Sequence, residues 1–102
     1  MDGTTEPPLF PLGRLAATPG ALAAMRAAGE SPPPPLSRHR RGDFGRLDPG
    51  DVRLQTLALR HEHDPEKRER MMSVYPLADG TVVRVITGAD RSSTCVLLPD
   101  EY

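Results

Sequence analysis

The sequence has no tryptophan, and aromatic residues make up only 4% of its 102 residues. Any hydrophobic core is therefore built mainly from leucine, valine, alanine and methionine. A chain of this length is expected to form one small domain, which buries only about two-thirds of its unfolded surface. The margin of stability is correspondingly small.

An internal disulfide is excluded, because Cys95 is the only cysteine. A single cysteine fits a reducing compartment, so the sequence predicts a cytoplasmic protein. No apolar run approaches the ~18 residues of a membrane span. The first residues also lack the basic start and the apolar stretch of a signal peptide, and no membrane contact is expected.

The chain lacks an excess of charge of either sign, with a formal net charge of −1. This balance argues against strong non-specific attraction to nucleic acid or to an anionic membrane. The densest basic patch, Arg38–Arg41, is interpreted first as a solvated surface. A nucleic-acid site is its less favoured alternative.

Three β-rich runs in the last third of the chain carry the fold prediction. They cover residues 70–77, 81–88 and 93–98. Asp79-Gly80 separates the first two runs and is typical of a hairpin turn. In the second run, Val83 and Val85 are expected to face one side of the sheet, while Val82 and Ile86 face the other. The pattern predicts a three-stranded antiparallel β-meander.

Two main helices are predicted before the strands, each with a clear start signal. Thr18 is expected to cap the first and Asp48 the second, and a proline follows each cap at the favoured first position. The second helix is expected over residues 52–61. Residues 1–17 are predicted to be an extended N-terminal segment, and residues 18–102 a single small domain.

These elements predict an α+β fold in which the two helices pack on one face of the meander. The buried face of the second helix is expected to consist of Leu54, Leu57 and Ala58, with Val52 nearby. Pro32–Pro35, between the helices, favours polyproline II. It is interpreted as a stiff spacer, with a ligand for an SH3- or WW-like domain as the alternative.

Neither a metal nor a cofactor is predicted. His61-x-His63-Asp64 offers suitable ligand types for a metal, but its spacing fixes no third ligand. No P-loop or Gly-x-Gly-x-x-Gly pattern is present. The charged run 61–70 is interpreted as a solvated loop or a fraying helix end.

Four polar residues support one enzymatic alternative, a small metal-independent ribonuclease of the barnase or RelE form. His39 would exchange protons with the ribose 2′-hydroxyl or the leaving oxygen. Arg41 and Arg91 would stabilise charge on the phosphate, and Tyr75 would orient the RNA or stack on a base. The structural alternatives are an ordinary turn around Arg91 and a tyrosine packed at the sheet rim.

Several motifs resemble one small bacterial family. They include Phe10-Pro11-Leu12-Gly13, Gly42-Asp43-Phe44-Gly45, Asp79-Gly80-Thr81 and Leu97-Leu98-Pro99-Asp100-Glu101-Tyr102. The family is the uncharacterised "plasmid-related protein" group, sometimes labelled a type I restriction endonuclease subunit M. This resemblance implies a bacterial accessory protein that is often carried on mobile elements.

The sequence therefore favours a non-catalytic accessory or interaction protein of a bacterial mobile element, which modulates a host defence or toxin system. The ribonuclease is the alternative. A protein partner or a homodimer is expected. The expected interface is an exposed apolar patch, or a dimer built on the third predicted strand as an edge of the sheet.

Overall fold

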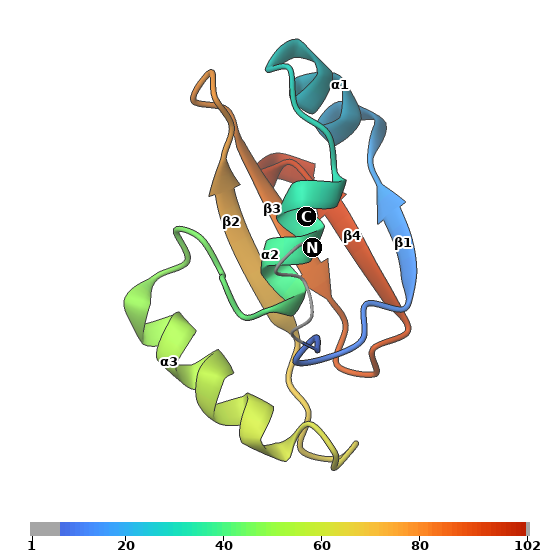
Figure 1. Ribbon diagram of the computed structural model, residues 1–102, viewed down its shortest axis with the longest axis vertical. Coiled ribbons are helices and arrows are strands. Elements are labelled where there is room, and N and C mark those ends of the chain that lie inside the picture. Colours follow the sequence, from blue (N-terminus) through green and yellow to red (C-terminus); the bar gives the residue numbers. More distant parts are fainter. Residues whose placement is uncertain (1–6, 102) are drawn as a thin grey trace.

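The computed structural model describes residues 7–101. Its elements along the chain are β1 (Arg14–Ala17), α1 (Pro19–Ala27), α2 (Pro33–Arg40), α3 (Pro49–Ala58), the 3₁₀ turn η1 (Leu59–His61), β2 (Met71–Pro76), β3 (Val82–Thr87), β4 (Ser93–Leu97) and the 3₁₀ turn η2 (Pro99–Glu101). The strands form one mixed sheet of order β1-β4-β3-β2 (Figure 1). The α+β class is confirmed. None of the helices within residues 7–101 has the length and apolar character needed to cross a membrane.

The predicted antiparallel meander is present as β2, β3 and β4. Gly80 lies in the turn between β2 and β3 at φ +92°, a conformation that glycine adopts without strain. Val83 and Val85 are fully buried, while Val82 and Ile86 are half-buried on the opposite face. The predicted alternation along the second strand is confirmed.

The sheet has a fourth strand that the sequence did not predict. β1 lies within the N-terminal segment and pairs with β4 in parallel, with Arg14 opposite Ser93 and Ala17 opposite Val96. The expectation that the third predicted strand is an edge is therefore wrong, because β1 occupies that side of β4. A strand of four residues whose partner lies almost 80 residues away leaves no local pattern to detect.

The proline run is helical, so its interpretation as a polyproline II spacer is wrong. Pro33–Pro35 form the first turn of α2. Backbone N–H groups in a first turn have no acceptor within the helix, so prolines there cost no intrahelical hydrogen bond. Pro35 is buried, which anchors this turn to the rest of the molecule.

Residues 7–101 contain three α-helices, and the two that the sequence predicted do not share one face of the sheet. α1 and α2 cover one face, while α3 lies apart from them beside the start of β2 (Figure 1). Both predicted caps are confirmed. Thr18 Oγ1 accepts a hydrogen bond from the N–H of Ala21 at 3.0 Å, and the Asp48 carboxylate accepts one from the N–H of Gly50 at 2.9 Å.

The core has two parts. The larger part lies between α1 and the sheet and consists of Ala21, Met25, Tyr75, Leu77, Val83, Val85 and Val96. The smaller part consists of Phe10, Phe44, Leu47 and Met71, and α3 packs against it through Val52 and Ala58. The N-terminal segment therefore contributes a buried aromatic ring as well as a strand.

The outer edge of β2 is closed by groups that do not belong to a strand. The Gln55 side-chain amide accepts a hydrogen bond from the N–H of Met72 at 2.9 Å and donates one to its carbonyl at 3.1 Å. The N–H of Val74 donates to the carbonyl of Phe44, and the N–H of Arg46 donates to the carbonyl of Val74. These bonds fix α3 and the segment before it against the sheet.

A pair of adjacent substitutions tests the two-faced sheet. Val85→Asp places an unpaired charge in the core and is expected to abolish cooperative unfolding, at a cost of at least about 4 kcal/mol. Arg84→Asp alters the opposite, half-buried face and is expected to cost about 1 kcal/mol or less. Urea unfolding followed by circular dichroism measures both, and equal losses would contradict this arrangement of the strands.

Candidate functional site

The imidazole of His39 is the centre of a buried polar network. His39 lies in α2, is fully buried and contacts two strands. Its Nδ1 lies 2.5 Å from Ser73 Oγ in β2, and its Nε2 lies 2.9 Å from Thr87 Oγ1 in β3. Thr87 Oγ1 lies 2.6 Å from Thr94 Oγ1 in β4, and Thr94 donates to the carbonyl of Leu12 at 2.7 Å.

The direction of each hydrogen bond in this network follows from its last acceptor, the carbonyl of Leu12. The Leu12 carbonyl can only accept, so Thr94 uses its single hydroxyl proton there. Thr87 must then donate to Thr94 and accept from Nε2–H of His39. Nδ1 carries no proton in this tautomer and accepts a hydrogen bond from Ser73. The network therefore fixes the Nε2–H tautomer of the neutral imidazole.

The environment strongly opposes a proton on this imidazole. Burial lowers the pKa of His39 from 6.5 to about 4, and the nearby positive charge of Arg91 acts in the same direction. The rings of Phe10 and Phe44 pack against the imidazole at interplanar angles of 88° and 75°, with centroid distances of 5.2 and 6.2 Å. His39 is thus neutral at physiological pH, with both nitrogen atoms occupied.

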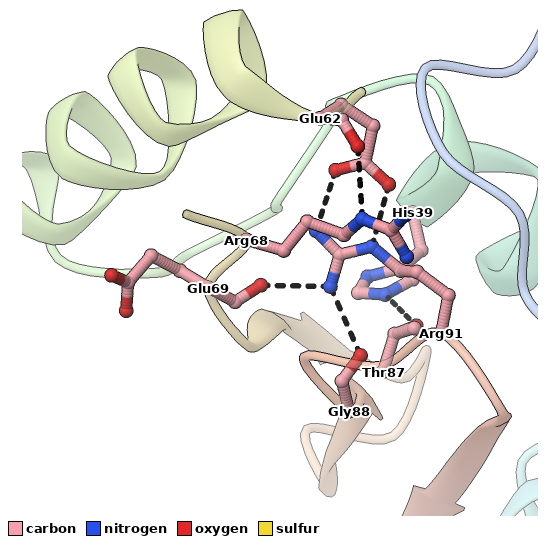
Figure 2. A network of polar contacts seen from close by, with 7 residues as sticks. All are labelled: His39, Glu62, Arg68, Glu69, Thr87, Gly88 and Arg91. Carbon is pink, nitrogen blue, oxygen red and sulfur yellow. Dashed lines mark hydrogen bonds and ion pairs between the residues drawn. The ribbon is translucent and has the colours of Figure 1, made fainter. Parts of the chain in front are cut away.

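Arg91 is the second buried polar group, and it ties the loop after α3 to the turn between β3 and β4 (Figure 2). Its Nη2 and Nε donate to the two carboxylate oxygens of Glu62 at 2.7 and 2.8 Å. Its Nη1 donates to the carbonyls of Glu69 and Gly88 at 2.7 and 3.0 Å. Arg68 also donates to the carbonyl of Glu62 at 2.9 Å, so the loop is held at both ends.

Arg91 lies in a turn, as one of the sequence-based alternatives stated, but the turn describes only part of its role. Arg91 has φ +61°, which is unusual for a residue with a side chain, and is only 5% exposed. Its guanidinium carbon lies 5.2 Å from the centre of the Phe10 ring. The bonds to Glu62 and to two carbonyls offset the strain of this backbone conformation and the burial of the charge.

The structure brings His39 and Arg91 together, with the Phe10 ring in contact with both. Tyr75 lies on the same face of the sheet but bonds elsewhere. Its hydroxyl donates to the carbonyl of Asp43 at 2.5 Å, and burial raises its pKa to about 12. Arg41 follows α2 and is exposed. The four candidates therefore do not form one open site.

An exposed ion pair borders Tyr75. The Arg38 guanidinium donates to Asp43 through Nε at 2.7 Å and Nη2 at 3.3 Å, and it lies 4.5 Å above the centre of the Tyr75 ring. This bond from Arg38 holds the pKa of the Asp43 carboxyl below its usual range. Part of the basic patch is thus used to hold the loop after α2 against the sheet.

One open feature of the surface lies at α3. A groove of about 610 Å³ runs between α3 and residues 67–72 and is lined by Leu47, Asp51, Leu54, Gln55, Leu57, Ala58, Arg60, His61, Lys67, Glu69, Arg70 and Met72. Leu54 and Leu57 are 65% and 44% exposed. The expectation that they are buried is wrong, because the Gln55 bond to Met72 turns a different side of α3 toward the sheet.

The sequence analysis did not predict this groove, although two of the residues that line it form a recognisable apolar pattern. Leu54 and Leu57 formed the strongest apolar stripe of the helix, and only the long-range contact of Gln55 shows that the stripe faces outward. Within residues 7–101, no group of three or more His, Cys, Asp or Glu side chains is placed to hold a metal ion.

No family model, curated protein or solved structure matches this chain. The resemblance to the plasmid-related proteins therefore stays a prediction.

The lowered pKa of His39 predicts that the free energy of unfolding depends on pH. The unfolded chain binds the proton below about pH 6.5 and the folded chain only below about pH 4. Between these values the unfolded state holds more protons, so the free energy of unfolding falls as the pH is lowered. The full effect is about 3 kcal/mol, at about 1.4 kcal/mol per pH unit.

Urea unfolding at pH 7 and pH 4.5 checks this expectation. His39→Gln removes the titrating imidazole and should flatten the pH dependence relative to the unaltered protein, whatever it costs in absolute stability. His61→Gln is the matched control, because it removes an exposed imidazole after α3. An identical pH dependence in the native protein and in His39→Gln would contradict the assignment.

The Arg91 network predicts the effect of neutralising its counter-charge. Glu62→Gln leaves a buried guanidinium without a carboxylate and is expected to lower the free energy of unfolding by about 3 kcal/mol. Glu66→Gln, at an exposed position in the same loop, is expected to change it by less than about 0.5 kcal/mol. Equal effects in urea unfolding would show that the pair does not hold the loop.

Proposed function

We propose that this protein is a non-catalytic interaction protein that binds another polypeptide through the groove along α3. The observation that carries the proposal is the outward position of Leu54 and Leu57. Single exposed leucines are common, but these two lie three residues apart on one helix and line one groove. Apolar anchors at this spacing are typical of helix-mediated recognition.

The polar residues of the core support a non-catalytic role. His39 has both ring nitrogens in hydrogen bonds, and Arg91 has its guanidinium engaged by a carboxylate and two carbonyls. Every buried side-chain nitrogen or oxygen atom among the described residues has a partner. These groups serve the fold, and the groove at α3 is a surface feature with apolar side chains available for a partner.

The resemblance to plasmid-related proteins adds a setting to this proposal. In that setting the protein is an accessory of a bacterial mobile element, and the bound polypeptide belongs to a host defence or toxin system. The charge around the groove is mixed, with Asp51 and Glu69 beside Arg60, Lys67 and Arg70, and this favours a protein over a nucleic acid.

The ribonuclease alternative draws support from the proximity of His39 and Arg91. The weakness of this alternative is that His39 is buried, since a general base must come within hydrogen-bond reach of the ribose hydroxyl. A ribonuclease would require α2 or the Phe10 segment to move away from the sheet. Cleavage of single-stranded RNA by the purified protein, lost in His39→Gln, would favour this alternative.

Site-specific photocrosslinking tests the interaction proposal. A benzophenone amino acid placed at Leu54 in cells of a bacterial host is expected to give discrete crosslinked species. The same group at Leu22, an exposed leucine of α1, is expected to give none of them. Identical patterns from both positions, or no product from Leu54, would count against binding at the groove.

A further inference from the structure

The outer edge of β1 carries backbone groups that face away from the sheet. β1 is the last strand on its side, because the strand order is β1-β4-β3-β2 (Figure 1). The N–H groups of Arg14 and Thr18 donate to backbone carbonyls on the β4 side, at 3.0 and 2.9 Å. In a parallel pair, the backbone groups of every second residue point to the same side. The N–H and C=O groups of Leu15 and Ala17 therefore point outward.

An apolar pocket adjoins this edge. It has a volume of about 240 Å³, and its lining includes Phe10, Leu12, Leu15 and Arg40. The volume suits one or two apolar side chains and falls below the range of about 300–1,000 Å³ that is typical of small-molecule sites. The Leu15 side chain is 56% exposed and shares the face of the sheet that carries Thr94. A strand laid beside β1 would therefore direct alternate side chains toward the pocket.

The charged residues at this edge are all basic. Arg14 of β1 and Arg40 of the pocket are exposed, and neither forms an ion pair with another residue of the 7–101 region. No acidic residue occurs in β1 or among the described residues that line the pocket. A second copy of this chain would thus bring cations to cations, whereas an acidic segment would complement both arginines.

We propose that β1 receives an extended acidic segment of another protein as a fifth strand of the sheet, with an apolar side chain of that segment in the pocket. The outward backbone groups of Leu15 and Ala17 supply the main-chain hydrogen bonds. The pocket, Arg14 and Arg40 supply the preference for apolar and acidic side chains. The groove at α3 adjoins β2, at the opposite edge of the sheet, so this surface is separate from the one proposed above (Figure 1).

The surface is held in place before a partner binds. The Leu12 carbonyl accepts a hydrogen bond from Thr94 at 2.7 Å, and the N–H of Leu9 donates to the carbonyl of Arg40 at 2.8 Å. These bonds fix the segment before β1 to the sheet and to α2. Gly13 has φ +67°, and a side chain there would collide with the backbone of the turn before β4. A preformed edge loses little conformational entropy on association.

Backbone methylation of a synthetic peptide tests the strand pairing. The probe is fluorescein-labelled Thr-Glu-Val-Glu-Leu-Glu-Thr, and fluorescence anisotropy is expected to give a dissociation constant between about 10 µM and about 1 mM. N–H groups alternate in direction along a strand, so N-methylation of the glutamates and N-methylation of Val and Leu block opposite edges of the peptide. One methylated peptide is expected to lose binding and the other to keep it. Loss with methylated Val and Leu indicates antiparallel pairing.

Substitutions in the protein test the same edge. Ala17→Pro removes an outward N–H but no bond to β4, and is expected to weaken peptide binding at least about tenfold in a folded protein. Arg40→Glu, at an exposed position, is expected to weaken it about tenfold. Arg53→Glu is the matched control on the exposed side of α3 and should leave the dissociation constant unchanged. Leu57→Lys, in the α3 groove, should also leave it unchanged.

A probe that does not bind at about 1 mM would overturn the proposal. Equal effects of the two methylated peptides, or undiminished binding by Ala17→Pro and Arg40→Glu, would do so as well. A native mass of twice 11.1 kDa by light scattering, reduced to 11.1 kDa in Ala17→Pro, would assign the edge to a second copy instead. Binding that is lost in Leu57→Lys and kept in Ala17→Pro would place the peptide in the α3 groove, which retains the proposed function and removes this one.

Discussion

A directed series of hydrogen bonds through the imidazole of His39 holds the layers of this protein together. It joins α2 to β2 and β3 directly, and reaches β4 and the N-terminal segment through Thr87 and Thr94. A core of this size, poor in aromatic residues, gains specificity from such bonds. A helix shifted by one residue would leave several buried polar groups without partners, at a cost of about 1–3 kcal/mol each.

Arg91 extends this internal order to the outer surface. Its bonds to Glu62 and to the Glu69 carbonyl position the loop after η1, and Lys67, Glu69 and Arg70 in that loop line the groove at α3. The shape of the proposed binding surface thus depends on a buried guanidinium. Phe10 contacts both Arg91 and His39, so one aromatic ring couples the two networks.

The sequence predicted the elements that depend on local chemistry. The caps at Thr18 and Asp48, the Asp79-Gly80 turn and the alternation along β3 all follow from short-range rules, and the structure has each of them. Prediction from the sequence failed for the features that depend on a contact between residues far apart in the chain. β1 exists because β4 lies beside it, and the exposed face of α3 is set by a bond from Gln55 to Met72.

The candidate residues show the same division. A histidine beside three basic residues looks like a phosphate site in the sequence, but Ser73 and Thr87 are presented to it only once the strands are paired. The polyproline II prediction for the proline run was wrong for a local reason. Its composition favours an extended helix without hydrogen bonds, whereas the first turn of an α-helix accepts the same residues.

The closed edge of β2 limits how this sheet can grow. The backbone groups of Met72 and Val74 are already bonded to Gln55, Phe44 and Arg46, and Pro76 has no N–H to offer. Among residues 7–101, the edge left to receive a further strand is the β1 side. A sheet with one open edge can pair with one other such sheet, and the pair then has no open edge left. Edge-to-edge polymerisation into a fibril is therefore blocked in the native fold.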